Sequence, residues 1–406
     1  MVNIAVLGYG TVGSGVVEVL RTNQISINNR AGQEINIKYV LDLREFPGDP
    51  VENILVHDYS VILNDEEVDI VVEVMGGVNP AYQFVKDALL KGKSVCTSNK
   101  ELVAKHGAEL LEIAKQNNIN FLFEASVGGG IPIIRPLNQS LTADEIMEIS
   151  GILNGTTNYI LTKMSKEGLA FDTVLKEAQE LGYAERNPEA DVEGYDACRK
   201  IAILSSLACG HQVDYEDIYT EGITKITDVD FKYAKELGVS IKLIGSSKRI
   251  GDGFCATVAP KMISDEHPLA GVNGVMNAIF VKGNVLGDVM FYGAGAGKLP
   301  TASAVVSDVV DAVKHMGRNI MTIWNTKKME LVNKEDISSA FFIRFSGEAD
   351  ADRIAVIEKA FGKGKVVKVA GVDGEFAYVT EVITEKAYAD AATQVDGIIS
   401  MIRMEQ

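Results

Sequence analysis

The residues most able to do chemistry begin with a glycine-rich loop near the N-terminus, Gly8-Tyr9-Gly10-Thr11-Val12-Gly13. It follows an apolar run and opens a helical pattern, the setting in which a G-x-G-x-x-G motif binds a dinucleotide. Gly8 allows the tight turn, Gly10 lets the backbone approach a pyrophosphate, and Gly13 lets helix and strand pack closely. The helix N-terminus, at Thr11 and Val12, supplies amides and a partial positive charge. The motif predicts a nicotinamide-dependent oxidoreductase, the alternative being a glycine turn that binds nothing.

A second candidate lies after the next apolar run, which reads Val40-Leu41-Asp42-Leu43-Arg44. Asp42 would favour NAD by binding ribose hydroxyls, whereas Arg44 would pair with the 2′-phosphate of NADP. The spacing from the glycine loop exceeds the usual value of about 20 residues, because Asn23–Gln33 is a polar extension. Both residues are equally well explained as ordinary loop charges, so the sequence leaves the choice between NAD and NADP open.

A third candidate is an acidic loop that leads into a helix. Gly182 to Lys200 reads Gly-Tyr-Ala-Glu-Arg-Asn-Pro-Glu-Ala-Asp-Val-Glu-Gly-Tyr-Asp-Ala-Cys-Arg-Lys. Asn187-Pro188 and the glycines indicate the loop, and Asp196 and Lys200, four apart, share one face of the helix that follows. One carboxylate and one ammonium therefore point the same way. Taken alone, this spacing is most simply a surface ion pair.

These motifs lie on an alternation of short apolar runs and helical patterns, which predicts a doubly wound α/β domain with a parallel sheet. We expect this dinucleotide-binding domain to span residues 1–133 and to be completed by 296–320, because an apolar helical pattern at Thr301–His315 follows a second glycine-rich run. The pattern of residues 134–295 predicts an α+β domain, and Gly317–Asp336 is expected to be a linker. Residues 338–406 predict a βαββαβ, ferredoxin-like domain.

The amino-acid composition restricts the classes of function that this chain could have. A chain of 406 residues with 47% hydrophobic and 23% charged residues predicts several globular domains. A net charge of -17 argues against nucleic acid as a partner. No apolar run approaches the roughly 18 residues of a membrane span, and four scattered cysteines fit a reducing cytoplasm. The five histidines show no metal or triad spacing.

The acidic loop resembles, position by position, the signature of homoserine dehydrogenases. The resemblance extends over essentially the whole chain, through the glycine loop and the segments Thr97–Lys100, Glu124–Pro132, Asn154–Asn158 and Gly293–Ser303. It implies hydride transfer between L-aspartate 4-semialdehyde and L-homoserine, on the branch leading to threonine and methionine. It also implies that residues 134–295 form the substrate-binding, catalytic and dimerisation domain of a homodimer or homotetramer.

The resemblance assigns roles to particular residues. Lys200 matches the acid/base lysine, whose ammonium would stabilise and protonate the oxygen that becomes negative as hydride arrives. Lys100 matches a second lysine beside cofactor and substrate. The substrate-pocket positions are Glu185, Asp191, Asp196, Gly182 and Thr156, with Glu185 the best candidate for binding the α-amino group.

Further cofactor and cation positions follow from the same resemblance. Gly76, Gly295 and Gly297 match loops beside the cofactor. Glu124, with the carbonyls of Val127, Gly129 and Ile131, matches a structural site for sodium or potassium, the alternative being a glycine turn without an ion.

The C-terminal segment resembles an ACT regulatory domain. The usual glycine-containing turn that holds an amino acid there is replaced by Gly347–Ala355, so we expect threonine feedback inhibition to be weak or absent. Two alternatives to the main interpretation are another semialdehyde or amino-acid dehydrogenase and, in a different class, a non-catalytic dinucleotide-sensing regulator. A regulator would not require the set Glu185, Asp196, Lys100 and Lys200, and a different dehydrogenase would lack the pattern from Asn187-Pro188 to Lys200.

Overall fold

Six parallel strands from the first third of the chain form one sheet in the computed structural model, which describes residues 1–405. The strands are β1 (Val2–Leu7), β2 (Ile35–Leu41), β3 (Leu55–Val56), β4 (Ile70–Glu73), β5 (Ser94–Thr97) and β6 (Phe121–Leu122). Their order, β3-β2-β1-β4-β5-β6, is that of a dinucleotide-binding sheet with its switch point between β1 and β4. Loops that leave the carboxyl ends of these two strands are therefore the expected place for a ligand.

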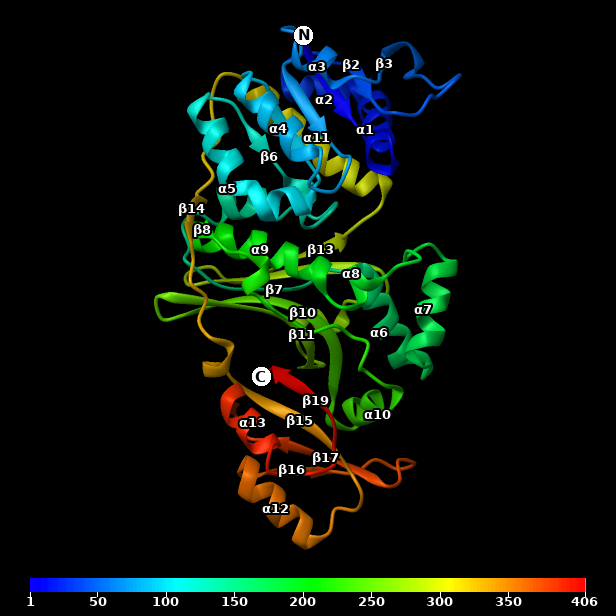
Figure 1. Cartoon of the computed structure of the whole chain (residues 1–406), viewed down its shortest axis with the longest axis vertical. Helices are drawn as coiled ribbons and strands as arrows, with labels where there is room; N and C mark the ends of the chain where they lie inside the picture. The colour runs from blue at the N-terminus through cyan, green and yellow to red at the C-terminus, as the bar shows by residue number, and fades with distance from the viewer. Residues whose placement is uncertain (406) are drawn as a thin grey trace. The chain divides into compact units, whose positions relative to one another are not determined.

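Helices cover this sheet because their apolar faces bury against it. They are α1 (Thr11–Thr22), α2 (Gln24–Ala31), α3 (Tyr59–Leu63), α4 (Ala81–Leu90), α5 (Lys100–Gln116) and, from much later in the chain, α11 (Lys298–Lys314). Figure 1 shows α11, in yellow, beside the blue α1. A Cβ built on Gly15 would lie 2.8 Å from the Lys298 carbonyl oxygen, so a glycine lets these two helices approach. The polar extension Asn23–Gln33 is largely the helix α2, which buries Ile27 and Ala31.

The chain divides into two compact units. Unit 1 comprises residues 1–147, 199–217 and 281–329, and unit 2 comprises residues 148–198, 218–280 and 330 onward. The expected linker Gly317–Asp336 is partly ordered, since β14 (Asn325–Lys328) pairs with β8 (His211–Gln212). Trp324 anchors it by donating its indole N–H to Gln212 Oε1 at 3.0 Å. No helix within residues 1–405 is both long and apolar enough to cross a bilayer.

Unit 2 is built on a long hairpin. β10 (Val239–Ile250) and β11 (Gly253–Ser264) pair antiparallel over their whole length, and β7 (Ile146–Ile152) pairs with β10. The helices here are α6 (Gly155–Glu167), α7 (Phe171–Glu180), α8 (Glu189–Val192) and α10 (Asp228–Leu237), with the short strand β9 (Tyr219–Thr220) beside β11. Unit boundaries fall within β7, within α9 (Tyr195–Cys209) and within β12 (Met276–Gly283), while β13 (Gly287–Ala294) lies in unit 1.

The last part of unit 2, which we call the C-terminal module, has the expected βαββαβ order. It consists of β15 (Ser338–Ser346), α12 (Ala351–Phe361), β16 (Gly364–Val367), β17 (Glu375–Thr380), the short β18 (Ile383–Thr384), α13 (Glu385–Ala392) and β19 (Ile398–Glu405). The sheet order is β19-β15-β17-β16, drawn orange to red in Figure 1. The parallel pairing of β19 with β11 extends this sheet into the hairpin of unit 2.

Alternation along β15 explains how the module is held. Phe341, Ile343 and Phe345 are fully buried in one core with residues of α12 and α13. Residues of opposite parity face α10: the Phe342 ring lies 5.6 Å from the Tyr233 ring, and Arg344 pairs with Asp230 at 2.9 Å. One face of β15 thus packs against α12 and α13 of the module, and its other face packs against α10 from outside the module.

Candidate active site

The glycine loop after β1 is shaped by the absence of side chains. Gly8 has a φ of 96°, and a Cβ on Gly13 would lie 1.9 Å from the Gly8 carbonyl oxygen. Gly10, the N-cap of α1, differs because a Cβ there would meet no atom within 4 Å. The loop therefore leaves open space above the N-terminus of α1, where Thr11 and Val12 begin the helix. This cradle fits the pyrophosphate of a dinucleotide.

Asp42 and Arg44 lie beside this loop and bind each other. Asp42 Oδ2 accepts a hydrogen bond from the Tyr9 amide at 2.8 Å, and both carboxylate oxygens accept from the Arg44 side chain at 3.0 Å. The Arg44 guanidinium holds the pKa of Asp42 well below its usual range. Arg44 itself is 62% exposed and lies over the Phe46 ring. The Asp42 carboxylate is therefore already hydrogen-bonded, whereas the Arg44 guanidinium is accessible to solvent.

Glu73 is a buried carboxylate at the end of β4 that sequence reasoning missed. Its Oε1 accepts from the amides of Met75 and Gly76, at 2.8 and 3.4 Å, and its Oε2 accepts from the Thr97 hydroxyl at 2.7 Å. Burial raises its pKa. The one available signal was an acidic residue closing the apolar run of β4. Glu73 fixes the loop of Gly76, which has a φ of 83°, against the end of β5.

Lys100 is the first residue of α5, and the loop before it is built by hydrogen bonds. The Thr97 hydroxyl accepts from the Asn99 amide at 2.9 Å, and the Asn99 side chain caps the helix by accepting from the Leu102 amide at 3.1 Å. Asn99 also donates to the Gly77 carbonyl at 2.6 Å. Lys100 is therefore presented from a fixed helix start at the carboxyl edge of the sheet.

The two glycine-rich runs of unit 1 meet each other. The Gly130 amide donates to the Ala294 carbonyl at 3.0 Å, and a Cβ on Gly129 would lie 2.3 Å from the Gly295 carbonyl oxygen. Gly297, with a φ of 115°, precedes α11 as its N-cap. Gly295 and Gly297 thus belong to a close backbone contact at the start of this helix.

Glu124 is buried and its carboxylate is occupied by backbone amides. Oε1 accepts from Ile133 and Ile134 at 2.6 and 2.9 Å, and Oε2 accepts from Arg135 at 2.7 Å. The turn nearby contains Val127, Gly129 and Ile131, whose amide donates to the Gly128 carbonyl at 2.8 Å. Among residues 1–405 no group of three His, Cys, Asp or Glu side chains is placed to hold a metal ion. Glu124 therefore orders this turn through three backbone hydrogen bonds.

The acidic loop of unit 2 is tied down at its start. Gly182 has a φ of 77°, and the Thr156 hydroxyl donates to the Tyr183 carbonyl at 2.7 Å. The Gln179 side chain donates to the Glu185 carbonyl at 3.1 Å, while the Glu185 side chain is exposed. The carboxylate of Glu185 is thus accessible on a loop whose backbone is anchored.

Asp191 and Asp196 converge on one side-chain amide, another residue that sequence reasoning left without a role. Asn154 Nδ2 donates to Asp191 Oδ1 at 2.7 Å and to Asp196 Oδ2 at 2.9 Å, while its Oδ1 caps α6 by accepting from the Thr157 amide. Its position directly before a helical pattern was the available signal. Asp196 and Lys200, four apart on α9, are both buried, at 4% and 8% exposure. A surface ion pair, the simplest use of that spacing, is therefore the wrong interpretation.

The sequence-predicted residues gather in two sets. The cofactor positions, the cation positions, Lys100 and Lys200 belong to unit 1, whereas Thr156, Gly182, Glu185, Asp191 and Asp196 belong to unit 2. Helix α9 carries members of both sets. Chemically, the first set offers a dinucleotide cradle and two ammonium groups, and the second offers clustered carboxylates.

Comparison with known proteins identifies what this chain resembles. Residues 132–310 match the family model described as homoserine dehydrogenase, and residues 8–124 match that of its NAD-binding domain. The homoserine dehydrogenase of Bacillus subtilis is 40% identical over 96% of this chain and 93% of its own length. That of Helicobacter pylori is 46% identical over 84% of this chain and 81% of its own.

Solved structures agree. A homoserine dehydrogenase from Thiobacillus denitrificans superposes with a TM-score of 0.90 at 38% identity, covering 100% of this chain and 98% of its own. A hyperthermophilic archaeal homoserine dehydrogenase in complex with NADPH superposes with a TM-score of 0.66 at 30% identity, covering 77% of this chain and 97% of its own. Sequence and structure thus point to the same family.

Proposed function

The chain belongs to the homoserine dehydrogenase family, and on that premise we propose which of its residues carry the reaction. The enzyme interconverts L-aspartate 4-semialdehyde and L-homoserine with NAD(P), a step in the biosynthesis of amino acids. A bound nicotinamide supplies or accepts the hydride. The protein must bind the amino-acid end of the substrate and manage the charge and proton at its reacting oxygen.

Lys200 is the proposed proton donor and acceptor. As an aldehyde is reduced, negative charge develops on its oxygen, and a positioned ammonium both stabilises that charge and protonates the alkoxide. The observation that carries the assignment is the burial of Lys200 on α9, one helical turn after buried Asp196. Lys100, on the fixed start of α5, is the proposed second lysine, which holds the carbonyl or passes the proton on.

The carboxylates of the acidic loop are proposed to bind the substrate's α-ammonium. Glu185 is the principal candidate because its side chain is accessible on an anchored loop. Asp191 and Asp196 would complete the pocket, with Asn154 holding their relative positions. Gly182 and Thr156 shape the loop from which Glu185 projects.

For the cofactor we propose NADP, with Arg44 binding the 2′-phosphate. Asp42 already accepts hydrogen bonds from the Tyr9 amide and from Arg44, so ribose hydroxyls would have to compete for it. The guanidinium is exposed and its planar donors suit a phosphate. The relative solved with NADPH is consistent with this choice.

A structural sodium or potassium ion remains a proposal. A carboxylate offers about four lone-pair sites, and three at Glu124 accept backbone amides. One site, with the carbonyls of Val127, Gly129 and Ile131, would be left for the ion. A melting temperature that rises with sodium or potassium but not with a bulky organic cation supports it, and equal melting in all three salts contradicts it.

The division into a dinucleotide-binding domain (1–133 with 296–320), a catalytic and dimerisation domain (134–295) and an ACT-like domain (338–406) is proposed on the family resemblance. We also propose a homodimer or homotetramer, a cytoplasmic location and no nucleic-acid partner. For the ACT-like domain we propose weak or absent inhibition by threonine. Strong inhibition of homoserine oxidation by millimolar threonine would refute that.

The deciding assay follows NADPH or NADH consumption with L-aspartate 4-semialdehyde in the wild type and in Lys200→Ala. Turnover in the wild type and its near loss in the variant are expected. Normal turnover in Lys200→Ala would refute the proposed proton donor. A wild type that binds the dinucleotide without turnover would favour the non-catalytic regulator instead.

A further inference from the structure

A cavity of about 240 Å³ opens where the C-terminal module joins the hairpin of unit 2. The join is the parallel pairing of β11 with β19, in which Lys261 faces Arg403 and Ile263 faces Glu405. We call the space the seam cavity and define it by the lining residues Tyr219, Lys261, Lys334, Glu385, Arg403 and Glu405. All of them belong to unit 2. The cavity is separate from the turn Gly347–Ala355 at the start of α12.

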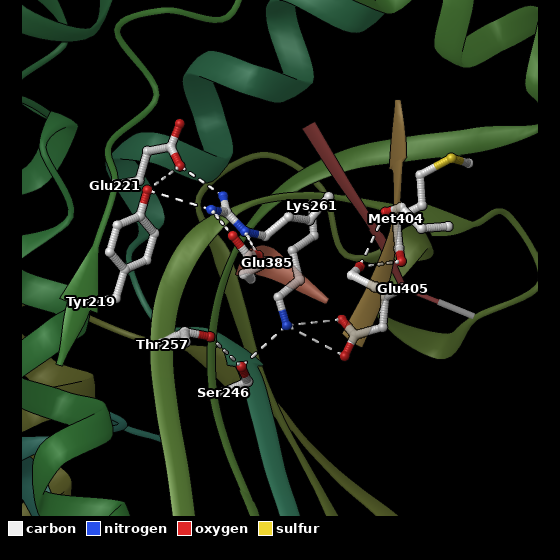
Figure 2. Close-up of polar contacts among 11 residues, drawn as sticks. Tyr219, Glu221, Ser246, Thr257, Lys261, Glu385, Met404 and Glu405 are labelled. Carbon is white, nitrogen blue, oxygen red and sulfur yellow. Dashed lines mark hydrogen bonds and ion pairs between the residues drawn. The ribbon is translucent and has the colours of Figure 1, made fainter. Parts of the chain in front are cut away.

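One wall of the seam cavity is locked by Arg403. Its Nε donates to Glu385 Oε1 at 2.5 Å, its Nη2 donates to Glu385 Oε2 at 3.0 Å, and its Nη1 donates to Glu221 Oε2 at 2.8 Å. The Tyr219 hydroxyl donates to the same Glu221 oxygen at 2.9 Å, as Figure 2 shows. Two carboxylates share one guanidinium, so this wall holds its own charges in place.

Two lysines that line the seam cavity, Lys261 and Lys334, are held less tightly. Lys261 Nζ lies 3.1 Å from Ser246 Oγ and 3.4 Å from both carboxylate oxygens of Glu405 (Figure 2). A close charge-assisted contact of this kind is about 2.7–2.9 Å, so the pair is not tight. Lys334 Nζ lies 3.2 Å from the centroid of the Tyr219 ring, and within residues 1–405 no carboxylate comes within 4.0 Å of it. Burial and the charge of Arg403 lower the pKa of Lys334.

The charges that line the cavity nearly balance. Four cationic residues, Lys248, Lys261, Lys334 and Arg403, face three carboxylates, Glu148, Glu385 and Glu405. A polyanion would meet those carboxylates at close range, and an apolar ligand would desolvate the lysines without compensation. A small molecule with one carboxylate and one ammonium matches both signs. Apolar residues such as Ile250 and Val382 complete the lining and suit a short side chain.

We propose that the seam cavity binds a zwitterion of amino-acid size, its carboxylate at Lys334 and Lys261 and its ammonium at Glu405. Only the expected effect of the ligand on turnover depends on the proposed function of this chain as a dehydrogenase. Binding itself is a property of the cavity and is testable without activity.

The structure also connects the cavity to the acidic loop. Tyr219 and Glu221 lead directly into Gly222 and Ile223, whose amide donates to the Val192 carbonyl at 2.8 Å. A Cβ on Gly222 would lie 2.2 Å from the Val192 oxygen, so the two segments are in tight backbone contact. Val192 lies between Asp191 and Asp196. A ligand that draws Lys334 away from Tyr219 would therefore shift the backbone that holds Asp191 and Asp196, the carboxylates proposed to bind the substrate.

Binding is measured by calorimetry on the full-length enzyme, with the L-amino acids added singly and inorganic phosphate as a separate probe. Homoserine and aspartate are left out because they resemble the substrate. At least one amino acid should bind, with Lys334→Met weakening its affinity at least tenfold and Lys232→Met, an exposed lysine on α10, leaving it unchanged. Absence of binding by every amino acid at 10 mM overturns the proposal. So does binding of phosphate alone.

A third variant separates the seam cavity from the turn before α12. Ala351 is exposed at the first position of α12, and Ala351→Glu would block a ligand carboxylate there. Binding that survives Ala351→Glu but not Lys334→Met supports the seam cavity, and the reverse result overturns it. In the wild type the bound amino acid should change KM for aspartate semialdehyde at least twofold, and this change should vanish in Lys334→Met. Unchanged kinetics on saturation would overturn the coupling to the acidic loop.

Discussion

The glycine loop of unit 1 and the acidic loop of unit 2 both lead into helices, yet they are built in opposite ways. The first is held by backbone proximity, with Gly13 so close to Gly8 that no side chain fits. The second is held by side chains, with Asn154 bridging Asp191 and Asp196. A loop made by missing atoms should fail when an atom is added, whereas a loop made by paired charges should fail when one group is removed.

The largest effect is expected from removing the charge that follows the acidic loop. Lys200→Ala should lower kcat by about 10²- to 10⁴-fold, the usual worth of a positioned acid or base. Dinucleotide binding should be retained, because the cradle after β1 is unaffected. Stopped-flow turnover with aspartate semialdehyde measures this, and added methylamine should restore part of the rate.

Lys163→Ala is the matched control, since that lysine is bound on α6 to Glu167 and Glu177. A similar loss of kcat in both variants would mean that general destabilisation, rather than proton transfer, explains the effect.

A smaller effect is expected from breaking the bridge between the carboxylates. Asn154→Asp keeps an acceptor that caps α6 but removes the donor shared by Asp191 and Asp196. An unmatched buried polar group costs about 1–3 kcal/mol, which corresponds to roughly a tenfold to hundredfold increase in KM for homoserine. Steady-state kinetics tests this, with Asn333→Asp, another helix-capping residue, as the control. An unchanged KM would show that the bridge does not position the substrate carboxylates.

Two alanine substitutions test the glycine loop from opposite sides. Gly13→Ala should lower the melting temperature of the free protein, because overpacking typically costs about 1–3 kcal/mol. Gly10→Ala should leave melting unchanged, since its Cβ meets nothing within 4 Å, yet weaken dinucleotide binding about tenfold by occupying the pyrophosphate space. Differential scanning fluorimetry and fluorescence titration with NADPH measure the two effects. Equal melting of both variants would refute the steric account of this loop.

The smallest effect concerns the exposed side chain beside the loop. Arg44→Gln should raise KM for NADPH by up to about tenfold, the loss of one partly solvated charge-assisted contact, and leave KM for NADH unchanged. The ratio of kcat/KM values for the two cofactors is the measurement. A ratio that does not move would remove Arg44 from phosphate binding.

The family and most of the fold could be predicted because both depend on local patterns. The alternation of apolar runs and helical patterns predicted the parallel sheet of the first third, and the expected helical pattern at Thr301–His315 is α11 (Lys298–Lys314). The polar α2 was not predicted, because its single stripe, Ile27 and Ala31, is too narrow to show a helical period. The strand β14 was missed because its residues are exposed and its order depends on distant Trp324.

The candidate site was predictable only where a motif names its residues. Glu73 and Asn154 act through partners distant in the sequence, Thr97 and the pair Asp191 and Asp196, so no spacing reveals them. Partly exposed Arg135 pairs with buried Asp308 across more than 170 positions, and burial and the nearby Glu124 raise the pKa of Asp308. Such long-range polar contacts become visible only once the chain is folded.

Helix α11 imposes an order on the synthesis of this enzyme. Its Ala302, Val305 and Val309 share one core with Val16 and Leu20 of α1, although almost 300 positions separate them. Until residue 314 has left the ribosome, the dinucleotide-binding sheet has all its strands but not the helix that covers part of its apolar surface. The nascent first third of the chain therefore keeps that surface exposed and cannot complete its core until α11 has been synthesised.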